Sequence, residues 1–577
     1  MKNKYTGETN IQILISLLKK HNIKNVIASP GTTNISFVAS VQSDDFFKVY
    51  SCVDERSASY LACGMAAETG EPVVITCTGA TASRNYIPGL TEAYYRKLPV
   101  IAITATQHLG RVGQNVAQVI DRSIQLKDMV KASIQLPSVY SEEDKWACNL
   151  NVNNVLLEAK RNGGGPVHIN MVTTYNNDFS CDVLPEQRMI ERICSEEKFP
   201  KIETAKVAIF IGNHARFSDE ETKNIEEFCE KYNAVVLCDH TSNYFGKYKI
   251  IGNLICSQQK SNLLKNIALL IDFGNVSGAY LPISPKEVWR ISVDGEIKDT
   301  FKKVKYIFDM NEKTFFEKYN KLKEEKGKTT YYEEWKNENE RLIKKLETVE
   351  LPFSNLWIAN KLIRNIKEKS VVHLAILNTL RSWNYYNTDK KINVFCNTGG
   401  FGIDGIVSTA VGASLCTDKN VYCVVGDLAF FYDLNSIGNR EIKNNLRILL
   451  INNGSGTEFH NYNHRATIVS NNNNIDSSYF AADGHFGNKS DFLVKHYAED
   501  LDFEYISAHN KEEFDNNLNK YIAEEQSKPI IFEIFTDYID ESNALKSINN
   551  LDFSAKNIVK QTIGEKNINK IKKFLRK

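Results

Sequence analysis

The sequence predicts an α/β protein built from three doubly wound domains with parallel sheets. Short Val- and Ile-rich runs, each closed by Gly, Thr or Asn, alternate with helical stretches along most of the chain. The length of 577 residues corresponds to about three to four domains of ordinary size. We expect domains at 1–185, 190–345 and 350–545, followed by a charged helical tail at 546–577. In such sheets the functional loops lie at the carboxyl ends of the strands.

In the first domain, an amphipathic helix is predicted at 11–21, followed by strands at 25–31, 72–78 and 98–104. The second domain is predicted to contain strands at 207–211, 234–238, 269–273 and 289–293. The Lys- and Glu-rich stretch 321–350 is interpreted as a solvated helix and linker. The third domain is predicted to contain strands at 370–374, 391–396, 421–425, 446–451 and 529–534.

The overall charge and the cysteine pattern exclude several classes of protein. Lys and Arg total 71 and Asp and Glu total 70, so the net charge is +1, which argues against a broad basic surface for nucleic acid. The 12 cysteines are scattered singly, unlike those of a disulfide scaffold. No window approaches the ~18 apolar residues of a membrane span. We therefore expect a cytoplasmic protein that binds neither nucleic acid nor membrane.

The strongest chemical signal lies at the ends of two successive strands of the third domain. The run 421–425 ends in Gly426-Asp427, and the run 447–451 leads into Asn452-Asn453-Gly454-Ser455. If these strands are neighbours, the Asp427 carboxylate and the Asn453 amide oxygen lie close together, as a hard divalent cation requires. Gly426 permits close approach of the backbone, and a helix N-terminus after Asp427 favours a diphosphate. Taken singly, Gly-Asp is also an ordinary turn and Asn-Asn an ordinary loop.

The pair resembles the motif of thiamine diphosphate enzymes, in which GD is followed some 25 residues later by NN. The segments 397–413, 53–58 and 78–93 also resemble that superfamily, which includes acetolactate synthase and pyruvate decarboxylase. The strongest likeness is to the menaquinone-pathway 2-succinyl-5-enolpyruvyl-6-hydroxy-3-cyclohexene-1-carboxylate synthases. It implies the thiamine diphosphate-binding fold, with a pyrimidine domain, a central domain and a diphosphate domain.

The resemblance also assigns roles to residues. Glu55 would hydrogen-bond the aminopyrimidine ring, so that the cofactor supplies its own base, and Ile403 would hold the cofactor bent. The implied metal ligands for Mg²⁺ (or Mn²⁺ or Ca²⁺) are Asp427, Asn453 and the Ser455 carbonyl. The implied catalytic residues are Glu55, Thr78 and Gln118. The implied cofactor-binding residues are Glu55, Asn378, Thr379, Gly402, Ile403, Gly426, Leu428, Ala429 and Asn453.

The quaternary structure and the flavin question follow from the same resemblance. In this family the glutamate comes from one protomer and the diphosphate site from another, which implies a homodimer or a dimer of dimers with shared active sites. Some relatives bind flavin in the central domain, but this chain has no glycine-rich fingerprint there, and we expect no FAD.

The chain departs from the synthase pattern where that pattern has substrate-binding arginines. Neutral side chains replace them at Thr33, Gln107, Trp383 and Thr398, and a neutral side chain cannot form the bidentate carboxylate contact of an arginine. We therefore expect the cofactor machinery with altered substrates. The candidate substrate residues are Thr33, Gln107, Arg381, Trp383, Glu458, His460 and His485. His464 and Arg84 are further candidates, although each of these side chains is also compatible with a purely structural role.

Three hypotheses follow. The first is an enzyme that decarboxylates a 2-oxo acid and transfers the acyl-anion equivalent to a carbonyl acceptor. Its close variant is a simple 2-oxo acid decarboxylase. The second is a catalytically inactive thiamine diphosphate-binding scaffold or regulator, which has no reason to keep Glu55. The third, a nucleotide-binding transport or signalling protein, lacks a GxxxxGK[ST] loop.

Overall fold

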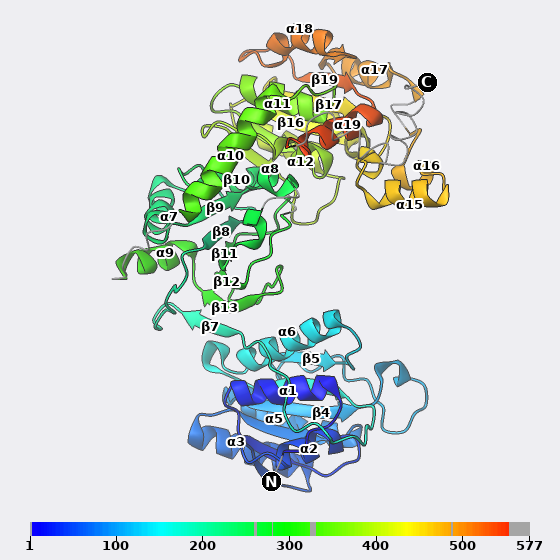
Figure 1. Ribbon diagram of the computed structural model, residues 1–577. Coiled ribbons are helices and arrows are strands. Elements are labelled where there is room, and N and C mark those ends of the chain that lie inside the picture. The colour runs from blue at the N-terminus through cyan, green and yellow to red at the C-terminus, as the bar shows by residue number, and fades with distance from the viewer. Residues whose placement is uncertain (1–2, 259–261, 280, 323–329, 486–488, 553–577) are drawn as a thin grey trace, which may run out of the picture. The chain divides into compact units, whose positions relative to one another are not determined.

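The computed structural model describes residues 3–258, 262–279, 281–322, 330–485 and 489–552 (Figure 1). Their contacts separate two compact units, one of Met1–Cys194 with Gly295–Ile307 and one of Ser195–Asp294 with Phe308–Lys577. The predicted tail lies outside the described residues from 553 onward, and its first residues close helix α19 (Tyr538–Ile548). The predicted domain boundaries stay predictions.

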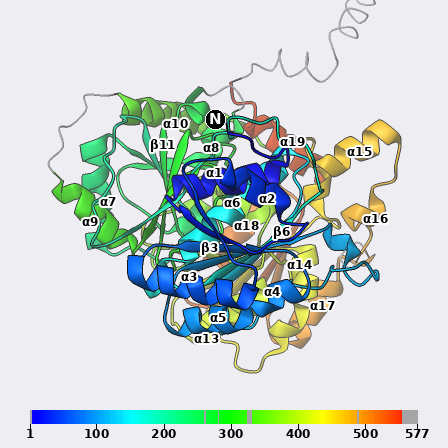
Figure 2. The ribbon, with the colours of Figure 1, turned by 90° about the horizontal axis from the view of Figure 1, so that it is seen from below.

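The first unit contains a six-stranded parallel sheet in the order β2-β1-β3-β4-β6-β5. Its strands are β1 (Asn25–Ala28), β2 (Lys48–Ser51), β3 (Val73–Cys77), β4 (Val100–Thr106), β5 (Ala132–Leu136) and β6 (Val167–Val172). One face is covered by α1 (Thr9–Lys20), α2 (Ile35–Gln42) and α6 (Glu142–Glu158). The other is covered by α3 (Glu55–Thr69), α4 (Thr81–Asn85) and α5 (Ile87–Tyr95), as Figure 2 shows.

The second unit contains a six-stranded parallel sheet with an equivalent order, β15-β14-β16-β17-β19-β18. Its strands are β14 (Val371–Leu374), β15 (Asn393–Cys396), β16 (Val421–Gly426), β17 (Leu446–Asn452), β18 (Glu504–Ala508) and β19 (Ile530–Phe535). One face packs on α13 (Ile406–Leu415), α14 (Asp427–Tyr432) and α17 (Leu493–Asp500). The other helices here are α11 (Asn355–Asn365), α12 (Asn378–Trp383), α15 (Arg465–Asn473), α16 (Ser478–Ala481) and α18 (Lys511–Tyr521).

The same unit also contains the parallel strands β10-β9-β8-β11-β12. They run over β8 (Val207–Ile211), β9 (Val235–Cys238), β10 (Lys249–Ile251), β11 (Leu269–Phe273) and β12 (Glu287–Ser292). The accompanying helices are α7 (Asp219–Tyr232), α8 (Gly252–Ser257), α9 (Glu312–Lys321) and α10 (Tyr331–Thr348). Strands β7 (Glu191–Cys194) and β13 (Val304–Asp309) lie where the chain passes between the units. The predicted α/β fold of three parallel-sheet domains is confirmed.

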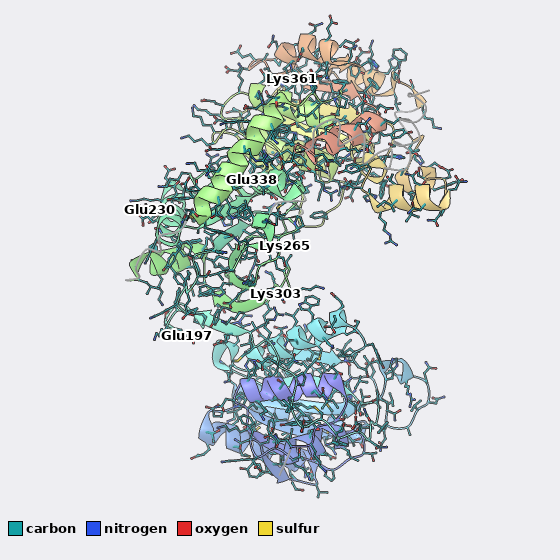
Figure 3. All side chains as sticks on the ribbon, viewed as in Figure 1. Glu197, Glu230, Lys265, Lys303, Glu338 and Lys361 are labelled. Atoms are coloured by element: carbon teal, nitrogen blue, oxygen red, sulfur yellow. The ribbon has the colours of Figure 1, made fainter. Side chains whose placement is uncertain are left out.

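Two sequence interpretations need correction. The stretch 321–350 is not simply solvated, because α10 buries Trp335 completely together with Leu342, while Glu338 (labelled in Figure 3) pairs with Arg341 on its charged face. The helix expected after Asp427 is short, because α14 ends at Tyr432 and a separate 3₁₀ turn follows at Leu434–Gly438. Within the described ranges, no helix combines the length and the apolar character needed to cross a membrane.

Candidate active site

The carboxyl ends of β16 and β17 bring Asp427 against the loop that follows β17. The two strands are paired in parallel, as the sequence predicted. The Asp427 carboxylate is 4% exposed and accepts hydrogen bonds from the backbone N–H groups of Leu428 at 2.8 Å and Gly454 at 2.7 Å. Burial raises the pKa of Asp427 to about 6, although these hydrogen bonds act in the opposite direction.

Asn453 and Ser455 provide further oxygens on the same loop. The Asn453 Oδ1 atom and the Ser455 hydroxyl are buried and have no hydrogen-bond partner among the described residues. A Cβ atom added at Gly426 would meet open space, so the backbone before Asp427 is accessible to a ligand. A buried carboxylate beside an unpartnered amide oxygen suits Mg²⁺, which takes few protein ligands and keeps places for phosphate oxygens. The residues present therefore fit a metal ion with a bound diphosphate.

The side chains and backbone assigned to the metal supply one carboxylate, one amide oxygen and one carbonyl oxygen, and none of these assigned ligands is a histidine or a cysteine. Within the described part of the chain, no group of three or more His, Cys, Asp or Glu side chains is placed to hold a metal ion. A cation at Asp427 would therefore depend on amide, carbonyl and phosphate oxygens to complete its coordination. This donor set makes metal binding dependent on the phosphate-bearing ligand.

The other predicted cofactor residues near the six-stranded sheet of the second unit lie at the ends of neighbouring elements. Asn378 and Thr379 begin α12, directly after β14, and Asn378 is half-buried. Ile403 is half-buried against the core cluster beneath α13. Because β14 and β16 lie where the strand order reverses, Asn378 and Asp427 occupy the switch point at which open α/β sheets bind ligands. Gly402 is exposed, while Leu428 is half-buried and Ala429 buried, both within α14.

The first sheet gathers its candidate residues at the corresponding switch point, between β1 and β3. The hydroxyls of Thr33 and Thr78 are hydrogen-bonded to each other across this point. Gly79 approaches Gln118 so closely that a Cβ atom would lie 2.5 Å from the Gln118 carbonyl oxygen. Gln118 itself has a positive φ of 64°. The structure thus brings together Thr33, Thr78 and Gln118, which lie far apart in sequence.

Strained backbone marks both switch-point regions. Ala80 (φ 53°, ψ −130°) lies two residues after Thr78, and Leu377 (φ 67°, ψ −123°) directly precedes Asn378. Non-glycine residues in such conformations cost about 1–3 kcal/mol each and concentrate at functional sites. The strained residues therefore lie next to Thr78 and Asn378, which were predicted from the sequence as site residues.

Glu55 occupies the first position of helix α3. Asp54 caps the helix by accepting a hydrogen bond from the Ser57 backbone N–H at 3.1 Å. The half-buried Glu55 carboxylate accepts one hydrogen bond from Asn85, at 3.2 Å. Its remaining acceptor capacity is available to a ligand.

The candidate substrate residues are not all in comparable surroundings. Arg381 forms an ion pair with Glu458, and both line a cavity together with His464. His460 is hydrogen-bonded to Asp483 at 2.9 Å and lies against the Tyr538 ring. His485 is exposed.

Two of the candidate substrate residues, Trp383 and Gln107, have side chains that are already engaged within the protein. Trp383 is fully buried and packs edge-on against His240, so its ring belongs to the core. Gln107 is hydrogen-bonded to Arg111 and to the Tyr175 hydroxyl. Arg84 donates to the Asp121 carbonyl oxygen at 3.0 Å.

Arg122 is a residue that the sequence analysis missed. Its side chain is 2% exposed, and its Nη2 donates to the Ala105 carbonyl oxygen at 2.9 Å. The Nε and Nη1 atoms are buried without a partner among the described residues, and burial lowers the guanidinium pKa to about 10. Its position in the Gln118 loop was the only available signal, because burial of an arginine cannot be inferred from one sequence.

Comparison with known proteins agrees with this geometry. Residues 9–125 match the thiamine pyrophosphate enzyme N-terminal TPP binding domain. The chain is 30% identical over 561 residues to the 2-succinyl-5-enolpyruvyl-6-hydroxy-3-cyclohexene-1-carboxylate synthase of Bacteroides thetaiotaomicron, covering 94% of this chain and 98% of that protein. The chain belongs to the thiamine pyrophosphate enzyme family.

Further members of this family show similar likeness over almost their whole length. The synthase of the same name from Phocaeicola vulgatus is 28% identical over 562 residues, with 94% of this chain and 98% of that protein covered. The one from Christiangramia forsetii is 27% identical over 594 residues, with 92% and 97% covered. The resemblance inferred from the Asp427 and Asn453 motif is confirmed.

Proposed function

We propose that this thiamine pyrophosphate family enzyme depends on Mg²⁺, decarboxylates a 2-oxo acid and transfers the acyl-anion equivalent to an acceptor, with substrates that differ from those of the synthases. The observation that carries the proposal is the buried Asp427 carboxylate beside the unpartnered Asn453 Oδ1, with open space at Gly426. These are the features required to hold a metal-bound diphosphate.

The residues at the two six-stranded sheets would have different roles. Bound thiamine diphosphate supplies a nucleophilic carbon and accepts the electron pair left when CO₂ departs. Asp427, Asn453 and the Ser455 carbonyl would hold the metal ion, and the Glu55 carboxylate would accept a hydrogen bond from a protonated ring nitrogen of the pyrimidine. The Thr33–Thr78 hydroxyl pair and Gln118 would orient the donor acid through hydrogen bonds.

The altered substrate is supported by the charges around the candidate residues. Thr33 and Gln107 are neutral where the synthase pattern has arginines, and Thr398 is buried and bonded to Asn213 at 2.8 Å. Arg381, in the second unit, is neutralised by Glu458. Thr33, Gln107 and Thr398 cannot form the bidentate carboxylate contacts of the arginines that they replace, which favours a small donor such as pyruvate.

We further propose a homodimer or dimer of dimers in the cytoplasm. Helix α3, which begins at Glu55, exposes Tyr60 and Leu61 to about half of their full extent (48% and 50%). Exposed apolar side chains beside a functional glutamate are consistent with a subunit contact at this helix.

The deciding experiment compares Glu55→Gln with Glu68→Gln, a control at the exposed far end of the same helix. We expect Glu55→Gln to lower CO₂ release from a panel of 2-oxo acids by more than tenfold, while Glu68→Gln leaves it unchanged. Product mass with added carbonyl acceptors distinguishes transfer from simple decarboxylation. Equal CO₂ release by the wild type and Glu55→Gln would contradict the assigned mechanism.

A further inference from the structure

A cavity of about 670 Å³ lies within the second unit, beside the start of helix α12. Helices α8, α12 and α19 and the 3₁₀ turn Thr457–His460 supply most of its lining. Its volume lies in the range of small-molecule sites. Asn378, which opens α12 at the switch point, is one of the lining residues, so the cavity extends from the region assigned to the cofactor. We call it the asparagine-lined cavity.

The lining is unusually rich in side-chain amides. Five asparagines contribute to it, namely Asn253, Asn378, Asn461, Asn463 and Asn549. An amide both donates and accepts hydrogen bonds, as does a hydroxyl group. Charged ligands are instead held by unpaired cations or anions. Amide-rich walls therefore match a ligand that carries several hydroxyl groups.

Some of these amides are held in place by one another, and others retain unused hydrogen-bonding capacity. Asn461 donates to the Asn378 Oδ1 at 3.3 Å, and Asn549 is bonded to the hydroxyls of Tyr385 and Tyr462 at 3.2 and 3.1 Å. By contrast, the Asn253 Oδ1 is buried without a partner among the described residues. An unsatisfied buried acceptor is costly unless a ligand or water completes it.

The ionisable groups of the cavity compensate one another. Arg381 is paired with Glu458, whose second oxygen, Oε2, is buried without a partner in the described part of the chain. Burial and the nearby Arg381 lower the pKa of His464, which disfavours the charged form of its ring. Both Glu541 oxygens share one bifurcated hydrogen bond from the Asn355 backbone N–H, a second hydrogen bond comes from the Thr536 hydroxyl, and burial raises the pKa of Glu541 to about 7. Among the described residues of the lining, the one arginine is therefore already paired and is not free to bind a carboxylate.

We propose that the asparagine-lined cavity binds an uncharged, polyhydroxylated compound of the sugar or cyclitol class, and that this compound carries the acceptor carbonyl. The identity of the compound as the acceptor rests on the proposed function, whereas its binding to the cavity does not. Asn253 Oδ1 and Glu458 Oε2 accept hydrogen bonds from its hydroxyls. Arg381 acts as a positioning residue that fixes the Glu458 carboxylate.

The binding test uses ligand-observed NMR saturation transfer on the full chain with four probes. D-fructose, D-xylose and myo-inositol are neutral polyols, and shikimate is a hydroxylated ring that carries a carboxylate. We expect saturation of the neutral polyols and little or none of shikimate. Asn253→Leu should weaken polyol binding by about three- to tenfold, the value of one lost hydrogen bond, and Asn472→Leu on the exposed face of α15 should leave it unchanged.

Glu458→Gln supplies a readout that a merely structural role would not produce. Removing the negative charge leaves the Arg381 guanidinium unpaired, so shikimate binding should increase while polyol binding declines. Asn463→Leu, at an exposed lining position, tests the same surface without burying a new apolar side chain in the core. The proposal would be overturned if shikimate bound the wild type as well as the polyols do. It would also be overturned if polyol binding were unchanged in both Asn253→Leu and Asn463→Leu.

The proposed function and the proposed ligand of the asparagine-lined cavity can be refuted independently. Thiamine diphosphate binding is measured in parallel as the rise in the thermal unfolding midpoint with cofactor and Mg²⁺. Normal cofactor binding without polyol binding refutes the cavity assignment alone. Polyol binding without any cofactor effect refutes the proposed function and leaves the cavity as a binding site of another kind.

Discussion

The adjacent residues Asn452 and Asn453 should respond differently to truncation, because among the described residues only the Asn452 side chain has a hydrogen-bond partner. Asn452 is buried and donates to the Glu533 Oε1 at 2.7 Å. Asn453 Oδ1 has no partner among the described residues. Replacing each by alanine therefore separates a residue kept for folding from one kept for a ligand.

The magnitudes follow from the unsatisfied groups. Asn452→Ala leaves the buried Glu533 oxygen without its donor and should lower the free energy of unfolding by about 1–3 kcal/mol. Asn453→Ala removes an acceptor that has no hydrogen-bond partner among the described residues, so the protein without cofactor should change by less than about 1 kcal/mol. With cofactor and Mg²⁺ at a hundred times the dissociation constant, the wild type should gain ~2.7 kcal/mol. Asn453→Ala should lose most of this gain.

The assay is thermal unfolding with and without thiamine diphosphate and Mg²⁺, with EDTA as the metal-free reference. Asn452→Ala should have a lower midpoint in both conditions but keep the full ligand-dependent rise. Asn453→Ala should have the wild-type midpoint without ligand and a small rise with it. The reasoning is refuted if Asn453→Ala retains the full rise, or if it destabilises the ligand-free protein as much as Asn452→Ala does.

Three further predictions concern stability. The pKa of Glu541 is raised to about 7 in the folded protein, so its contribution is fully present below pH 4.5 and is lost as the pH rises through 7. The free energy of unfolding of the wild type minus that of Glu541→Gln should therefore fall by up to ~1.4 kcal/mol per pH unit across this window, and denaturant titrations at several pH values measure it. Arg122→Met removes a buried cation with two donors that have no partner among the described residues. The free energy of unfolding, measured by urea titration, should therefore stay unchanged or rise by about 1–2 kcal/mol. A large loss of stability would contradict this and would indicate an unrecognised partner of Arg122. Trp335→Ala should cost about 3–5 kcal/mol if α10 belongs to the core, and a surface helix would lose almost nothing in the same measurement.

The elements that could be predicted from sequence are those with an uninterrupted local signal. The strands β8 and β11 match their predicted ranges because both are buried apolar runs. Strands β5 and β18 were not predicted, because they lie at sheet edges and are only partly buried. In α10 the abundance of Lys and Glu concealed Trp335, which lies on a buried stripe of helical spacing.

The candidate site likewise contains residues that could be placed from the sequence and residues that could not. Asp427 and Asn453 could be placed together because each directly follows a predicted strand and the two strands are consecutive. The Arg381–Glu458 pair could not, since it joins α12 to a 3₁₀ turn 77 residues away, and that contact depends on packing. The burial of Trp383 was also beyond prediction, because a six-residue helix carries too little periodicity to reveal which face is inward.

The unpartnered oxygen of Asn453 has a consequence for the protein in a living cell. Because a ligand would be the partner of this oxygen, cofactor and Mg²⁺ would stabilise the folded chain, and a newly made chain lacks that stabilisation until they bind. Chains that lack cofactor would unfold more often, and proteases remove unfolded chains. The steady-state abundance of this enzyme would therefore follow the supply of thiamine diphosphate and magnesium, so that vitamin starvation would reduce the amount of protein as well as its activity.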